Sequence, residues 1–189
     1  NSTGPTHNPY RHGFSAGGSS SGSAALVSSG SVDMAVGGDQ GGSIRIPASF
    51  CGVYGMKPTY GLVPYTGVMP LEVTVDHVGP MTNNVADNAL LLEVIAGPDG
   101  YDPRQNYIET QDYTRALNED VKGIKIGVVT EGFGHANSED DVDDCVRAAA
   151  AHFQSLGARV EEVSIPTHLD AQPVAMPILT YGVLQTMLA

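Results

Sequence analysis

The chain has 189 residues, a hydrophobic content of 41%, and 21 acidic against 9 basic residues, which gives a formal net charge of −12. A chain of this length can bury one good core, and its acidity argues against unassisted binding to the phosphate backbone of a nucleic acid. It has no run of about 18 apolar residues to suggest a membrane span, and its first residues lack the basic and apolar regions of a signal peptide, so we expect a cytoplasmic protein with no membrane partner.

The first part of the chain predicts a loop, a helix and a strand around two glycine-rich clusters. Residues 1–16 contain Gly-Pro, Asn-Pro and Arg-His-Gly turn signals, which predict a loop. Residues 23–29 are apolar and short in side chain, so we expect a helix that packs closely on its neighbours. Residues 34–37 predict a short strand that ends in glycines. The second cluster therefore lies where a strand leaves a sheet.

This second cluster places consecutive backbone N–H groups around one hydroxyl, because Gln40, Gly41 and Gly42 directly precede Ser43. Glycine lets amide groups approach a bound atom without a Cβ in the way. A serine nucleophile needs such donors, since the carbonyl that it attacks becomes an oxyanion, and each lost donor raises the barrier by roughly 3–4 kcal/mol. The pattern favours Ser43 as a nucleophile with these four residues as its oxyanion hole.

The first cluster supplies hydroxyls that could relay a proton from that serine. Ser19, Ser20 and Ser21 lie on a glycine-flanked turn, and a hydroxyl can pass a proton onward but cannot keep it. Taken alone, such a cluster is more often a flexible loop. A phosphate-binding P-loop is excluded because no lysine follows the cluster, and a G-x-S-x-G nucleophile elbow fails because Arg45 replaces its last glycine.

Together, the two clusters resemble the amidase signature family. The matching segments are GGSSSGSAA at 17–25 and DQGGSIRIPA at 39–48. The resemblance implies a Ser-cisSer-Lys triad, with Ser43 as nucleophile, Ser19 as the bridging serine on a cis peptide, and a lysine as base. In the family that lysine lies well upstream, and none of the three lysines of this chain, Lys57, Lys122 and Lys125, stands in the matching place.

The resemblance also implies the fold: an α/β domain with a mixed β-sheet core covered by α-helices, incomplete at both ends. Residues 1–189 would be the central portion of one such domain. The chain opens in what reads as mid-loop and closes in an apolar helix, 178–189, without a C-terminal cap, which also suggests a fragment. Ser20, Asp39 and Arg45 are the expected supporting residues. Arg45 either pairs with Asp39 across the turn or points into solvent, and we favour the structural role.

The function that the resemblance implies is hydrolysis of a carboxylic acid amide, aliphatic or aromatic, to carboxylate and ammonia, with no cofactor. Gln40 stands where the family's transfer-RNA amidotransferase subunits usually carry threonine, which favours a free-standing amidase like those associated with nitrile hydratases. An amidotransferase subunit that supplies ammonia to a partner, or a non-catalytic fragment, are the alternatives. The expected partner is a small-molecule amide and not a nucleic acid; a homodimer of the full-length protein is left open.

Other candidate sites are weaker. Asp76-His77 would allow a Ser-His-Asp triad with Ser43, but adjacent residues on a strand point apart, and the family uses no histidine as base. The six histidines have no H-x-x-x-H pair, so no metal site is predicted. Cys51 and Cys145 are expected to be reduced, with Cys51 a buried apolar residue.

The remaining segments predict packing elements. Residues 82–97 have helical spacing and end at Gly97. Strands at 123–129 and 158–165 flank a helix that begins at a capping box, Ser138 to Asp141, and the three form a βαβ unit with parallel strands. The expected buried face of this helix is apolar and consists of Val142, Cys145, Val146, Ala149, Phe153 and Leu156.

Overall fold

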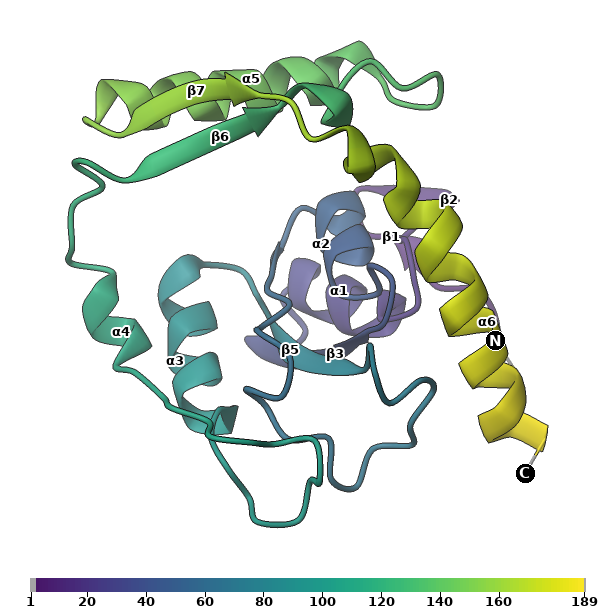
Figure 1. The fold of residues 1–189 in the computed structure, drawn as a ribbon. Helices are drawn as coiled ribbons and strands as arrows, with labels where there is room; N and C mark the ends of the chain where they lie inside the picture. Colours follow the sequence, from purple (N-terminus) through teal and green to yellow (C-terminus); the bar gives the residue numbers. More distant parts are fainter. Residues whose placement is uncertain (1–2, 189) are drawn as a thin grey trace. The chain divides into compact units, whose positions relative to one another are not determined.

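The structure is a computed structural model that describes residues 3–188. It confirms the predicted α/β class (Figure 1). The backbone contacts divide the chain into two compact units: the first runs up to Leu117 and resumes at Met176, and the second comprises residues 118–175. The membership of both units in one domain stays a prediction.

The first unit begins with a hairpin of two short strands, where the turn signals predict only a loop. Strand β1 (His7–Asn8) pairs antiparallel with β2 (Arg11–Ser15). The Asn8 side chain explains the difference, since its amide donates to the carbonyl oxygens of Ser15 and Phe50 and its oxygen accepts the N–H of Tyr10. The turn signal at Asn8 therefore closes a hairpin, and the loop prediction for residues 1–16 was wrong in this respect.

A three-stranded antiparallel sheet carries the second glycine cluster. Its strand order is β3 (Met34–Asp39), β5 (His77–Thr82) and β4 (Tyr54–Gly55). The register places Val36 opposite Pro80 and Asp39 opposite His77. The predicted strand at 34–37 is thus confirmed and continues to Asp39, so that the glycine cluster follows the strand end directly.

The first unit also holds helices α1 (Ser21–Ser28), α2 (Arg45–Cys51), α3 (Val85–Ile95) and the short α4 (Tyr113–Ala116). The predicted helices at 23–29 and 82–97 are confirmed. Helix α3 begins at Asn84, whose side chain accepts the N–H of Asp87 as an N-cap. The core between the sheet and the first two helices is made of small and medium side chains: Ala16, Ala24, Ile44, Ala48, Cys51 and Met81.

Close approach of these elements depends on glycine in strand β3. A Cβ on Gly37 would lie 2.9 Å from Ser20 Oγ and 3.0 Å from the side chains of Ile44 and Met81. The first serine cluster and the segment after Ser43 therefore pack directly on the strand backbone. As predicted, Cys51 is fully buried in this core. Cys51 and Cys145 are both free thiols in the structure.

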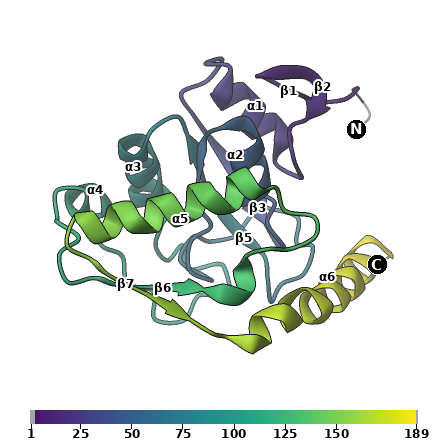
Figure 2. The ribbon, with the colours of Figure 1, turned by 90° about the horizontal axis from the view of Figure 1, so that it is seen from above.

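The second unit contains the predicted βαβ arrangement. Strands β6 (Lys125–Val129) and β7 (Arg159–Val163) are parallel, and α5 (Asp140–Ser155) connects them (Figure 2) and contacts β7. Short 3-10 turns follow each strand, at Thr130–Gly132 and Pro166–Asp170.

Two predictions about α5 were wrong. Its N-cap is Glu139 without a side-chain hydrogen bond, because the Ser138 hydroxyl donates to the carboxylate of Asp143 instead of capping the backbone. The apolar face predicted to be buried is exposed: Val142, Phe153 and Leu156 are 54%, 41% and 52% accessible. Within the described residues, the two strands of this unit offer too little surface to cover a helix of 16 residues.

Helix α6 (Ala171–Leu188) confirms the helix predicted at the end of the chain and begins earlier than expected. Its part from Met176 onward belongs to the first unit, where Thr186 Oγ1 donates to the Leu71 carbonyl at 3.2 Å. None of the helices in residues 3–188 combines the length and apolarity that crossing a membrane requires.

Candidate active site

The carboxylate of Asp39 organises the turn that follows strand β3. It is fully buried and accepts the backbone N–H of Gly42 at 2.7 Å and that of Ile44 at 3.1 Å. Arg45 adds a two-pronged ion pair, with Nε 3.0 Å and Nη2 2.9 Å from the two carboxylate oxygens. The predicted Asp39–Arg45 pair is therefore present, and Arg45 does not simply point into solvent.

The electrostatics of Asp39 follow from these contacts. Burial by itself would raise the pKa of Asp39, but the hydrogen bonds from Arg45, Gly42 and Ile44 outweigh burial and hold the pKa below its usual 3.8. The carboxylate is thus ionised at neutral pH. In this state it fixes the backbone on both sides of Ser43.

Ser43 lies half-buried in the turn between β3 and α2, next to the first serine cluster. The N–H of Ser20 donates to the carbonyl oxygen of Ser43 at 3.1 Å, which joins the two segments directly. Ser19, the residue before Ser20, is exposed, and the Gly18–Ser19 peptide bond is cis. Within residues 3–188, the hydroxyls of Ser19 and Ser43 form no hydrogen bond with each other.

Ser20 anchors the first cluster to the sheet. Its hydroxyl accepts the N–H of Gly38 at 3.1 Å and donates to the Gly38 carbonyl at 3.2 Å. The side chain therefore binds the backbone of β3 while its own N–H binds Ser43. The supporting role expected for Ser20 in the reaction stays a prediction.

The four predicted oxyanion donors differ in their surroundings. The N–H of Gly42 is already bonded to Asp39. The N–H groups of Gly41 and Ser43 donate to no other group in the part of the chain that the structure describes. At Gln40 the side-chain amide donates to the hydroxyl of Tyr65 at 3.0 Å. The oxyanion role stays a prediction, in which Gly41 and Ser43 are the donors best placed to contribute.

The alternative triad through Asp76 and His77 lacks the hydrogen bond between the aspartate and the histidine ring that such a triad needs. The Asp76 carboxylate accepts the N–H groups of Leu71 and Glu72, and His77 Nδ1 lies 2.7 Å from the carbonyl of Val75. The Asp76 carboxylate therefore holds a loop, and it does not orient the His77 ring through a hydrogen bond. This supports setting the Ser-His-Asp alternative aside.

Lys57 lies close enough to the site for the charges of Arg45 and Asp39 to affect its pKa. Its ammonium group donates to the carbonyl of Pro58 at 2.8 Å. Burial lowers the pKa of Lys57, and the positive charge of Arg45 lowers it further, while Asp39 opposes both. No group of three or more His, Cys, Asp or Glu side chains among the described residues could hold a metal ion.

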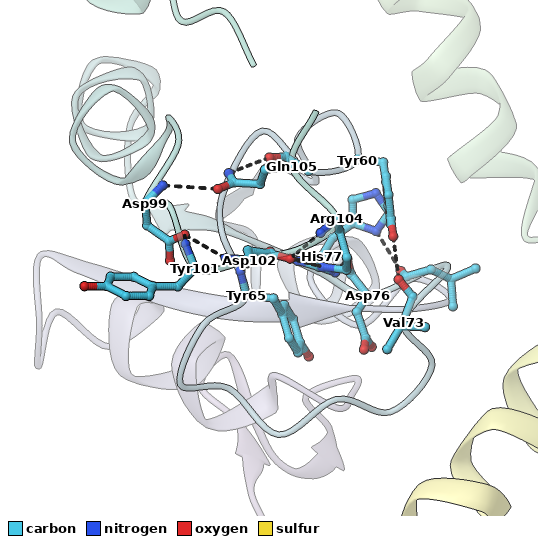
Figure 3. Close-up of polar contacts among 12 residues, drawn as sticks. Tyr60, Tyr65, Val73, Asp76, His77, Asp99, Tyr101, Asp102, Arg104 and Gln105 are labelled. Carbon is cyan, nitrogen blue, oxygen red and sulfur yellow. Dashed lines mark hydrogen bonds and ion pairs between the residues drawn. The ribbon is translucent and has the colours of Figure 1, made fainter. Parts of the chain in front are cut away.

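Sequence reasoning missed a cluster that borders this turn. The buried ion pair between Arg104 and Asp102, at 2.6 Å, lies beside the Tyr65 ring and lines a cavity of about 430 Å³ (Figure 3). The sequence of segment 98–104 predicts only a polar loop. The Asp-Pro-Arg sequence at its end was the available signal, but its partner Tyr65 is 37 residues away from Asp102.

The comparisons with known proteins agree on one family. A family model described as Amidase matches residues 1–188. The chain is similar to the enantioselective amidase of Rhodococcus rhodochrous, with 55% identity over 188 residues that cover 97% of this chain and 36% of that protein. It is also similar to a glutamyl-tRNA(Gln) amidotransferase subunit from Synechococcus sp. (strain CC9902), with 50% identity over 167 residues that cover 88% of this chain and 34% of that protein.

Solved structures give the same result for the fold. A glutamyl-tRNA(Gln) amidotransferase subunit from Thermotoga maritima superposes with a TM-score of 0.91 at 39% identity, over 97% of this chain and 40% of that one. A bacterial aryl acylamidase of the amidase signature family gives 0.85 at 35% identity, over 97% and 38%. The chain thus spans about a third of the length of the curated relatives it matches. It belongs to the amidase signature family.

Proposed function

We propose that the full-length protein, meaning this chain together with the remainder of a family-length sequence, hydrolyses a carboxylic acid amide to carboxylate and ammonia. Ser43 is the nucleophile and Ser19 the bridging serine. The base is a lysine that this chain does not contain. The observation that carries the proposal is the contact of the two serine segments: Ser20 N–H donates to the Ser43 carbonyl at 3.1 Å, next to the turn whose backbone N–H groups are held by the Asp39 carboxylate.

The chemistry runs through an acyl-enzyme. Ser43 Oγ bonds to the amide carbonyl carbon as its proton passes to Ser19 Oγ, whose own proton passes to the lysine. Backbone N–H groups at Gly41 and Ser43 stabilise the oxyanion. The carbon–nitrogen bond then breaks, and ammonia leaves with a proton returned through Ser19. Water hydrolyses the resulting ester by the same relay in reverse.

A free-standing amidase acting on a small aliphatic or aromatic amide is the form that we favour. Gln40 supports it, because the family's amidotransferase subunits usually carry threonine at this place. The greater identity and coverage of the Rhodococcus rhodochrous amidase support it as well. Neither a nucleic acid nor a membrane is a proposed partner. The cytoplasmic location stays a prediction.

An amidotransferase subunit is the second candidate. The TM-score of 0.91 to the Thermotoga maritima protein and the 50% identity to the Synechococcus protein favour it. Such a protein would hydrolyse glutamine and pass ammonia to a partner. Ammonia release from glutamine, with little or none from simple amides, would select this candidate over the first.

The test measures ammonia release by the full-length protein from benzamide and propionamide. We expect Ser43→Ala and Ser19→Ala each to lower kcat at least about 1000-fold, because members of a catalytic triad act as a unit. Ser49→Ala is the matched control, since Ser49 is exposed on the neighbouring helix α2. Undiminished activity in Ser43→Ala would refute the proposed nucleophile, whatever the substrate.

A further inference from the structure

We propose that Tyr65 is a positioning residue for this reaction: its hydroxyl holds the side-chain amide of Gln40 and so fixes the backbone of the Gly41–Gly42–Ser43 loop. The inference rests on the proposed function of that loop. Gln40 Nε2 donates to Tyr65 Oη at 3.0 Å, and the Tyr65 side chain is buried. The contact joins two segments 25 residues apart in the sequence.

Tyr65 is itself held in place, which a positioning residue requires. Its backbone N–H donates to the Asp102 carboxylate at 2.8 Å, and the Arg104 guanidinium lies 4.8 Å from its ring centre. Arg104 in turn binds Asp102 at 2.6 Å and the Asp76 carbonyl at 2.9 Å (Figure 3). The tyrosine is thus fixed at its backbone, on its ring and at its hydroxyl.

The arginine of the ion pair that holds Tyr65 is largely shielded from water, unlike the arginine at the nucleophile turn. The side chains of Arg104 and Asp102 are 11% and 3% exposed, whereas the Arg45 side chain is 54% exposed. A pair screened from water by its surroundings holds a fixed geometry better than one in solvent. Burial also raises the pKa of Tyr65 above its ordinary value of 10. The neutral hydroxyl accepts the hydrogen bond from Gln40.

The loop benefits from a second tether because Gly41 and Gly42 have no side chains through which it could be held. Asp39 binds the N–H groups of Gly42 and Ile44 but not that of Gly41. Gly42 has a φ of +121°, a conformation that favours glycine, so this position carries no side chain that could anchor the loop. Holding Gln40 through Tyr65 therefore restrains the Gly41 N–H from its N-terminal side, and donors that are already oriented are the ones that stabilise an oxyanion.

The experiment compares Tyr65→Phe with Tyr60→Phe in the full-length protein. Tyr60 belongs to the same cluster, with its ring 5.4 Å from Arg104, but its hydroxyl donates to the Val73 carbonyl and not to the loop. Both variants lose one hydroxyl and keep the ring. We expect Tyr65→Phe to lower kcat about 3- to 10-fold with KM changed less than about twofold, as for a single hydrogen bond acting on the transition state. Tyr60→Phe should leave kcat within about twofold of wild type.

A double-mutant cycle shows whether Tyr65 acts through Gln40. Gln40→Ala alone should lower kcat as much as Tyr65→Phe, and the double variant should be no slower than either single variant. The inference is overturned if the losses of kcat in the two single variants multiply in the double variant. It is also overturned if Tyr65→Phe leaves kcat unchanged, or if Tyr60→Phe lowers kcat as much as Tyr65→Phe does.

A second measurement does not depend on turnover. Hydrogen exchange of a peptide covering residues 40–44 should be faster in Tyr65→Phe than in wild type, and unchanged in Tyr60→Phe. Equal exchange in all three proteins would overturn the positioning role even if the protein hydrolyses amides. Ser43→Ala tests the proposed function separately, so a failure of either proposal can be told from a failure of the other.

Discussion

Replacing Asp39 by asparagine tests whether its charge holds the nucleophile turn. The change keeps the size of the side chain but turns one buried acceptor into a donor. One carboxylate oxygen accepts from Gly42 N–H and Arg45 Nη2, and the other from Ile44 N–H and Arg45 Nε. Either orientation of the asparagine therefore loses at least two hydrogen bonds, at least one of them from the backbone of the turn.

The magnitude follows from burial. A buried donor left without its partner costs about 1–3 kcal/mol, and breaking a fully buried ion pair costs about 3–5 kcal/mol. Because the Arg45 side chain is 54% exposed, water replaces part of what it loses. We therefore expect Asp39→Asn to lower the free energy of unfolding by about 2–4 kcal/mol. Arg45→Gln should cost only about 1 kcal/mol, since it removes the solvent-facing partner and leaves the backbone donors bound.

Urea unfolding of the full-length protein at pH 7 measures both effects, with kcat recorded in parallel. Asp33→Asn is the matched control because Asp33 is exposed just before strand β3, and it should change stability by less than about 0.5 kcal/mol. The reasoning fails if Asp39→Asn unfolds at the wild-type midpoint. It also fails if Arg45→Gln costs as much as Asp39→Asn, because the turn would then depend on the exposed pair alone.

Further predictions concern pH and the close contacts of the sheet. The pKa values of Asp39 and Asp102 in the folded protein both lie below the usual 3.8. The two carboxylates therefore contribute stability above pH 3.8, and this contribution is lost as the pH falls through their folded-state pKa values. Urea midpoints measured from pH 7 to pH 3 should accordingly fall less steeply in Asp102→Asn than in wild type. Gly79→Ala should destabilise by about 3 kcal/mol in thermal or urea unfolding, because the new Cβ would overlap the backbone carbonyl of Met56. Gly22→Ala, in helix α1 with no atom within 4 Å of the new Cβ, should instead stabilise by about 0.5–1 kcal/mol, and a loss of stability there would contradict the packing described.

The sequence was most informative where local signals act over a few residues. The small-residue helix before strand β3, the helix at 82–97 and the βαβ unit all follow from spacing and glycine positions. The pair of Asp39 and Arg45 could also be predicted, because the two residues are only six positions apart, across a glycine-rich turn. In each case the elements that meet are neighbours along the chain.

Predictions failed where a side chain had more than one possible partner. Ser138 had the spacing of a capping box, yet its hydroxyl binds the side chain of Asp143, which also accepts the N–H of Gly134. The spacing of apolar residues in α5 correctly indicated a helix with one apolar face. It could not indicate whether this face is buried, because that depends on how much sheet is present to cover it. Turn signals at residues 1–16 likewise did not distinguish a loop from the hairpin of β1 and β2.

The nucleophile turn is held by one contact between residues close in the sequence and by another between distant segments. For this reason the pair of Asp39 with Arg45 could be predicted and the support from Tyr65 could not. Asp39 reaches Arg45 across a turn, so the sequence alone suggested that pair, whereas the bonds from the Gly42 and Ile44 N–H groups to Asp39 came from the structure. Tyr65 reaches Gln40 only because the Asp102 carboxylate holds its backbone from 37 residues further along, and nothing in the local pattern of residues 98–104 indicates that target. A change at Asp102 should therefore loosen Gln40 while leaving the Asp39 bonds intact, so the two supports are separable by mutation although they hold the same four-residue loop.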